Sequence, residues 1–137
     1  MTRTIRQSVL LRASPDLLFD TYLDRRGHQA VTGGKVSIPA RPGSRFSAFD
    51  GMITGRTLEV LPKRLIVQSW RSGGWQADDP DSILVLAFSP GRQAGTGRID
   101  LVHIGVPAHD HDGVVKGWRT YYWRPWRAYL TKARRAR

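Results

Sequence analysis

The fold is decided by residues 112–133, DGVVKGWRTYYWRPWRAYLTKA, which form the longest helical segment that the sequence predicts. At about 100° per residue, aromatic and apolar side chains fall on one broad face and basic side chains on the opposite side. The inner face would hold Val115, Trp118, Tyr122, Pro125, Trp126 and Tyr129, and the outer side Lys116, Arg119, Trp123, Arg127 and Arg134. Because Pro125 lacks an N–H and crowds the carbonyl of Tyr121, we expect a kink there, which suits packing against a curved sheet.

The chain before this helix has strand periodicity, interrupted by Gly and Pro. Ser14-Pro15-Asp16 has the serine cap, early proline and acid of a helix start, and a second short helix or turn is expected over 24–32. Short connections favour antiparallel neighbours, so we predict an α+β fold with helices gathered on one face of a curved antiparallel sheet. The expected strands are 4–12, 35–39, 45–50, 53–61, 65–71, 83–89 and 98–106.

Composition places the chain among single globular domains. Its 137 residues are the size of one domain, and a hydrophobic content of 40% excludes global disorder. The chain has no cysteine, so disulfide scaffolds, thiolate metal sites and thiol nucleophiles are excluded. No apolar run is long enough to span a bilayer, and no stretch like a signal peptide follows Met1, so we expect a cytoplasmic protein.

The net charge of +11 comes from 22 Lys and Arg against 11 Asp and Glu. Four of these basic residues lie in residues 132–137, which we interpret as a solvated basic tail. The remaining charges are scattered through the chain and do not form one patch. The distribution therefore does not favour nucleic acid as the partner.

Several short motifs, each weak alone, occur along the chain in the order of one family. They include Ala13-Ser14-Pro15, Gly43-Ser44-Arg45-Phe46, Gln68-Ser69-Trp70-Arg71 and Gly117-Trp118, followed by Tyr121-Tyr122-Trp123. From about residue 3 to 131 the chain resembles homologues of the activator of the heat-shock-protein-90 ATPase, within the START-like (SRPBCC) superfamily. The eukaryotic activators also carry a separate N-terminal domain, for which these residues leave no room.

This resemblance implies a START-like domain over residues 1–137 with a helix-grip fold. In that fold a curved antiparallel sheet of about six to seven strands surrounds a long C-terminal helix, and two short helices follow the first strand. The superfamily commonly binds hydrophobic ligands between the sheet and the helix. The family supplies no catalytic residue set that we can carry over to this chain.

The aromatic residues Trp70, Trp118, Tyr122 and Trp126 have two interpretations. They line a ligand pocket between a strand and the last helix, or they fill the core. His103 lies in an apolar strand, where it either faces a cavity and orients a ligand or moves a proton, or is a satisfied core histidine. We assign these five residues as candidate ligand-binding residues and assign no catalytic residue.

Trp123 is the unexpected residue of the helix, because the wheel places it between Arg119 and Arg127 on the basic side. Its ring either packs within the molecule, stacked on guanidinium groups, or forms part of a surface for a protein partner or a homodimer. The three residues are therefore a candidate partner surface.

Two polar clusters bear on metal binding. His109-Asp110-His111-Asp112 has suitable donors for zinc or nickel, but adjacent residues do not easily converge on one ion, and Asp112 suits a helix cap. Asp78-Asp79-Pro80-Asp81 is interpreted as a solvated acidic turn. The sequence contains neither G-x-G-x-x-G nor a Walker motif, so we predict no metal and no cofactor.

The leading hypothesis is therefore a non-enzymatic domain that binds a small hydrophobic or aromatic molecule between the sheet and the C-terminal helix. The first alternative is a protein-interaction module linked to stress or chaperone function. The second is a cyclase- or hydrolase-like enzyme that uses His103 as acid or base, which requires another polar residue beside it.

Overall fold

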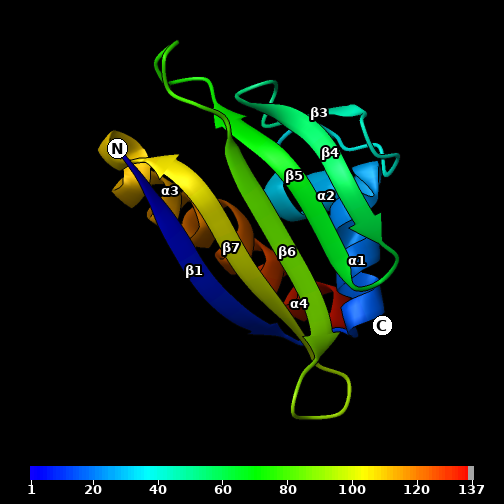
Figure 1. Cartoon of the computed structure of the whole chain (residues 1–137). Coiled ribbons are helices and arrows are strands. Elements are labelled where there is room, and N and C mark those ends of the chain that lie inside the picture. The colour runs from blue at the N-terminus through cyan, green and yellow to red at the C-terminus, as the bar shows by residue number, and fades with distance from the viewer. Residues whose placement is uncertain (136–137) are drawn as a thin grey trace.

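A computed structural model describes the backbone of residues 1–135 and the side chains of residues 1–133. Seven strands form one antiparallel sheet in the order β1-β7-β6-β5-β4-β3-β2, and Figure 1 shows the helices gathered on one face of it. This arrangement is the predicted α+β helix-grip fold. The elements are β1 (Thr2–Leu11), α1 (Pro15–Leu23), α2 (Arg25–Thr32), β2 (Val36–Ser37), β3 (Arg45–Ala48), β4 (Ile53–Leu61), β5 (Leu65–Ser72), β6 (Ser82–Pro90), β7 (Gly97–Pro107), η1 (Ala108–Asp110), α3 (His111–Gly117), η2 (Trp118–Trp123) and α4 (Arg124–Arg135).

Side-chain caps begin the two short helices after the first strand. The Ser14 hydroxyl accepts a hydrogen bond from the Leu17 amide at 3.1 Å, with Pro15 at the first position of α1. The Asp24 carboxylate accepts from the Gly27 amide at 2.7 Å, so the second predicted element is a helix and not a turn. The core lies between these helices and the sheet.

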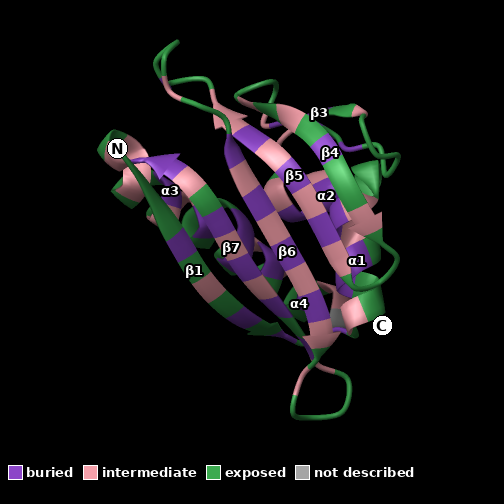
Figure 2. Ribbon diagram, in the orientation of Figure 1, coloured by how far each residue is buried: buried purple, intermediate pink, exposed green. Residues whose placement is uncertain are grey.

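Alternation along the central strands separates the two faces of the sheet (Figure 2). In β6, for example, Leu84 and Leu86 are buried beneath the helices, whereas Ile83 and Val85 are half-buried on the other face. The strand bounds agree with the prediction to within two residues at each end, and β2 shrinks to only Val36–Ser37. Gly34 and Pro39, which flank β2, are both poor strand residues.

The C-terminal helix differs from the continuous, kinked α-helix that the sequence predicts. Its middle part, η2, is a π-helix, in which the Arg124 amide donates to the carbonyl of Arg119, five residues earlier. This wider turn immediately precedes Pro125, so the chain accommodates the proline by a local change of helix type. Because a π-turn encloses one more residue than an α-turn, one more side chain reaches the inner face.

The helix continues to Arg135, so the predicted basic tail at 132–137 begins inside α4, and residues 136–137 lie outside the described part of the chain. Within residues 1–135, no helix combines the length and the hydropathy needed to cross a membrane.

Candidate functional site

A pocket of about 470 Å³ opens at one end of the interior, between the β3–β4 turn, the end of β5 and the first half of the C-terminal helix. Its wall is mainly apolar and aromatic. It is lined by Phe49, Met52, Ile53, Trp70, Ser72, Asp110, Gly113, Val114, Gly117, Trp118, Tyr121 and Tyr122.

Three of the five predicted ligand-binding residues, Trp70, Trp118 and Tyr122, line this pocket. The Trp118 and Tyr122 rings pack together with their centroids 4.8 Å apart. His103 and Trp126 do not line it, because His103 lies behind the wall and Trp126 is buried deeper beneath the helix. Of the four aromatic residues, Trp70, Trp118 and Tyr122 thus line a pocket, whereas Trp126 is part of the core.

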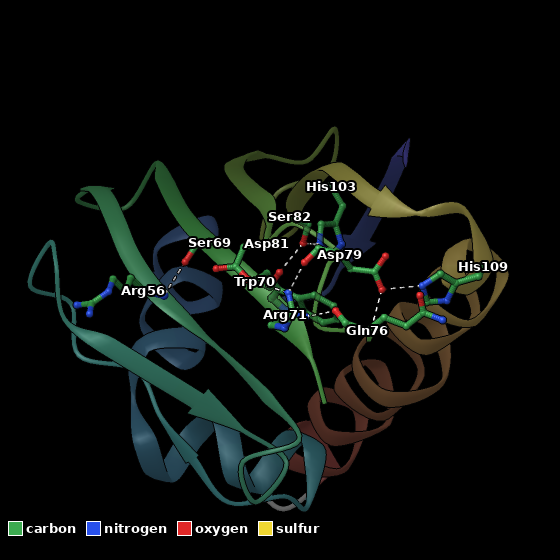
Figure 3. Close-up of polar contacts among 10 residues, drawn as sticks. All are labelled: Arg56, Ser69, Trp70, Arg71, Gln76, Asp79, Asp81, Ser82, His103 and His109. Carbon is green, nitrogen blue, oxygen red and sulfur yellow. Dashed lines mark hydrogen bonds and ion pairs between the residues drawn. The ribbon is translucent and has the colours of Figure 1, made fainter. Parts of the chain in front are cut away.

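His103 is fully buried and is connected through Ser82 to Trp70 of the pocket wall (Figure 3). The Trp118 indole N–H donates to His103 Nδ1 at 3.2 Å, and because an indole can only donate, the ring proton of the neutral histidine is on Nε2. That nitrogen donates to Ser82 Oγ at 2.8 Å, and the Ser82 hydroxyl donates to the Trp70 carbonyl at 2.7 Å. Each side chain in this series of hydrogen bonds has its partners, and the series holds Trp70 and Trp118 in place.

Burial lowers the pKa of His103 to about 3, so the ring is neutral at physiological pH. The hydroxyl of Ser82 donates to a backbone carbonyl and not to the imidazole, which is opposite to the direction that an activated serine requires. A serine that the sequence alone did not place near His103 is thus present, but the geometry is that of a structural hydrogen-bond chain.

A second buried histidine, His28 of α2, holds Tyr122 in place. Its Nδ1 donates to the Tyr22 carbonyl at 2.7 Å, and its Nε2 accepts from the Tyr122 hydroxyl at 2.9 Å. The Tyr22 hydroxyl in turn donates to Gln68 Oε1 at 2.8 Å. Burial lowers the pKa of His28 to about 4 and raises the pKa of the Tyr122 hydroxyl well above its ordinary value. Sequence reasoning missed His28 as a support, because its partner is 94 residues away.

Of the two interpretations of Trp123, packing within the molecule agrees with the structure, but the ring packs on the inner side against other tryptophans and not on guanidinium groups. Its side chain is only 7% exposed, and its ring stacks between Trp118 and Trp126, with centroids 5.7 and 6.4 Å away. Its indole N–H donates to Gln7 Oε1 of β1 at 2.7 Å. The π-helical turn is the physical reason, since it brings Trp123 to the inner face. Arg119 and Arg127 remain exposed, and Arg127 donates to the Leu10 carbonyl at 3.1 Å.

The two polar clusters meet through His109 and Asp79 (Figure 3). His109 contacts the Asp79 carboxylate at 2.7 Å, and the hydrogen bond from His109 lowers the pKa of Asp79. Asp79 is half-buried, so the acidic turn is not entirely solvated. Asp110, and not Asp112, is the residue that precedes α3. Among the residues described, no three His, Asp or Glu side chains converge as metal ligands would.

Several wall residues were not predicted as such from the sequence, notably Phe49, Met52 and Tyr121. Phe49 and Asp50 have positive φ angles of 52° and 57°, and Gly51 follows with 87°. Three successive left-handed residues turn the chain back at the pocket mouth. Asp50-Gly51 marks a turn in the sequence, but only the fold shows that this turn lies beside the C-terminal helix.

Comparison with known proteins agrees with this architecture. Residues 12–131 match the family described as Activator of Hsp90 ATPase homolog 1-like protein. The chain belongs to this family. It is 25% identical over 119 residues to the human Activator of 90 kDa heat shock protein ATPase homolog 1, which covers 87% of this chain and 34% of the human protein. The chain thus spans about a third of the length of that relative.

Solved structures of other proteins share the fold. The crystal structure of an HSP90 activator from Plasmodium falciparum superposes with a TM-score of 0.73 at 21% identity, covering 85% of this chain and 87% of that one. A crystal structure from Chromobacterium violaceum gives 0.72 at 25% identity, covering 93% and 96%. These similarities establish the helix-grip fold of the family for this chain.

Proposed function

We propose that this domain binds a small hydrophobic or aromatic molecule in the pocket beside Trp70, Trp118 and Tyr122, without catalysing a reaction. The observation that carries the proposal is the pocket itself, whose volume of about 470 Å³ suits a small ligand. Aromatic walls supply apolar contact area, and a small number of polar groups would set the orientation of the ligand.

The wall is held in place before any ligand arrives. Trp118 is fixed by His103, Tyr122 by His28, and Trp75, which packs 5.6 Å from Trp70, by Asp110. A preformed wall reduces the conformational entropy that binding would otherwise cost. The neutral, fully bonded His103 supports a binding role over acid–base chemistry.

Gly117 provides the sharpest test, because it lines the pocket and has room for a side chain. A Cβ atom at this position would meet only the Tyr121 ring, at 3.8 Å. Gly117→Leu should therefore fold and fill the pocket. We expect the uncharged dye Nile red to bind the unmodified chain saturably and to bind Gly117→Leu at least tenfold more weakly, measured by fluorescence titration.

Thr120→Leu is the matched control, since it adds a leucine at an exposed position of the same helix outside the pocket. Circular dichroism should show native secondary structure for both variants. Equal dye affinity in Gly117→Leu and the unmodified chain, or no saturable binding at all, would overturn the proposal.

A second candidate function is interaction with a chaperone of the Hsp90 class, and the family membership favours it. The exposed Arg119 and Arg127 form the basic surface available for such a contact. Adding the purified chain to Hsp90 should then change the rate of ATP hydrolysis, and Arg119→Glu with Arg127→Glu should abolish the change. An unaltered ATPase rate at saturating concentrations would rule this candidate out.

A further inference from the structure

We propose that the pocket selects ligands that carry a protonated amine on an aromatic or hydrophobic body. This inference rests on the proposed ligand-binding function and names the chemical class of the ligand. It comes from the position of Asp110 in a wall that is otherwise uncharged.

Asp110 is the one charged residue among the twelve described residues that line the pocket. Its Oδ2 accepts the Trp75 indole N–H at 2.8 Å, which fixes the carboxylate. Its Oδ1 has no hydrogen-bond partner within the described chain and lies over Gly113, where a Cβ would come within 2.4 Å of it. Gly113, itself a lining residue, thus leaves the space that this oxygen occupies.

No basic side chain of the described residues forms an ion pair with Asp110, although the chain has twice as many basic as acidic residues. Two acidic residues of the β5–β6 loop, by contrast, each contact a basic side chain. Asp79 contacts His109 at 2.7 Å, and Asp81 contacts Arg71 at 3.2 Å. The Arg71 guanidinium is also bonded to the Asp79 carbonyl at 2.6 Å, which holds it in the β5–β6 loop. Asp110 therefore lacks a cationic partner, which a ligand would provide.

The aromatic side chains of the wall complement the same charge. Trp70, Trp118 and Tyr122 line the pocket, as do Phe49 and Tyr121, whose rings pack edge-on with centroids 5.7 Å apart. An ammonium group is attracted to the faces of such rings, most strongly to tryptophan. A carboxylate beside aromatic rings favours a cation over a neutral or anionic group of the same size.

The net charge of +11 acts against a cationic ligand at long range. At physiological ionic strength, however, charges are screened over about 8 Å, so scattered surface arginines act weakly inside the pocket. A carboxylate in direct contact is screened much less, so the local charge of Asp110 decides the preference.

The test compares three molecules with one ring system, namely tryptamine (cationic), tryptophol (neutral) and indole-3-acetate (anionic). We expect titration calorimetry at pH 7 to show tryptamine binding about tenfold more tightly than tryptophol, and indole-3-acetate binding more weakly than either. Asp110→Asn should remove the advantage of tryptamine and leave tryptophol unchanged. This variant keeps an oxygen that can accept the Trp75 N–H.

Asp112→Asn is the matched control, because this carboxylate lies nearby but its side chain is 91% exposed and does not line the pocket. It should retain the full preference for tryptamine. In the unmodified chain, the preference for tryptamine over tryptophol should persist between 20 mM and 1 M NaCl, because a direct contact with Asp110 is screened little. This measurement does not depend on a variant folding.

The outcomes separate the two proposals. If tryptophol and tryptamine bind equally, or the preference persists in Asp110→Asn, the amine inference is wrong and the proposed binding function stands. If none of the three molecules binds and Nile red also fails to bind, the proposed function itself is wrong.

Discussion

Gln7 joins the first strand to the C-terminal helix through both ends of its side-chain amide. Its oxygen accepts the Trp123 indole N–H at 2.7 Å, and its nitrogen donates to the Val115 carbonyl at 3.2 Å. Val115 and Trp123 lie in different parts of the helix, α3 and η2. One residue of β1 therefore sets how both parts sit on the sheet.

Gln7→Ala should lower the free energy of unfolding by about 1–3 kcal/mol, because it leaves the buried indole N–H of Trp123 without a partner. Urea denaturation followed by tryptophan fluorescence measures the change. Arg119→Ala serves as the control at an exposed position of the same helix, with an expected effect within about 0.5 kcal/mol. A loss no larger than that of Arg119→Ala would show that this hydrogen bond does not contribute to stability.

Among the elements, the C-terminal helix has the most unusual geometry, since a π-helical turn separates two α-helical parts. The wider turn lies directly before Pro125, whose ring would crowd the Tyr121 carbonyl in a regular α-helix. The same turn brings Trp123 into the core. One local change of helix type thus accommodates Pro125 without a clash and adds Trp123 to the aromatic cluster.

Pro125→Ala should therefore lower the stability slightly, by about 0.4–1 kcal/mol, because the main effect is greater freedom of the unfolded chain. A proline that strained an α-helix would give the opposite result, a gain of about 3 kcal/mol on replacement. The midpoint of urea denaturation distinguishes the two, and a gain near the larger figure would contradict the role assigned to η2.

Sequence patterns predicted the elements well where local signals exist. The bounds of β4 are those predicted, and Ser14 caps α1 as its position indicated. The helical wheel misplaced Trp123 because it assumes 100° per residue throughout, and a π-turn breaks that assumption. No pattern of apolar residues indicates such a turn, although a proline shortly after four aromatic residues marks where it occurs.

At the scale of the whole molecule, two neutral histidines, His28 and His103, connect the pocket wall to the core. Burial lowers their pKa values to about 4 and about 3, from an ordinary value of 6.5. At a pH between these lowered pKa values and 6.5, the unfolded chain binds more protons than the folded chain. Protonation therefore favours unfolding.

The contribution of the two neutral histidines to the free energy of unfolding should accordingly be fully present above about pH 6.5. Below that pH the free energy of unfolding should fall by about 1.4 kcal/mol per pH unit for each histidine. Urea denaturation between pH 7 and pH 4.5 measures this slope. The ring protons of His28 and His103 should keep constant NMR chemical shifts from pH 8 to pH 5. Titration of either ring near pH 6.5 would contradict the burial argument.

The candidate site could be predicted only in part. The sequence allows three wall residues to be predicted, Trp70, Trp118 and Tyr122, because strand alternation and helical spacing place them on inner faces. Phe49, Met52 and Asp110 were not, because they belong to turns whose place beside the pocket depends on how distant elements pack. His28 and Gln7 act through partners far along the chain, and a local pattern carries no information about such pairs.

The pairing of β1 with β7 has a consequence for folding order. Residues 2–11 form hydrogen bonds with residues 97–107, while the other strands pair with neighbours in the chain. During synthesis, the first strand to leave the ribosome therefore waits without a partner until residue 107 has been made. Long-range strand pairing is intrinsically slow. We expect the hairpins of β3 to β7 to form early, and β1 to be the last strand protected in pulse-labelling hydrogen exchange.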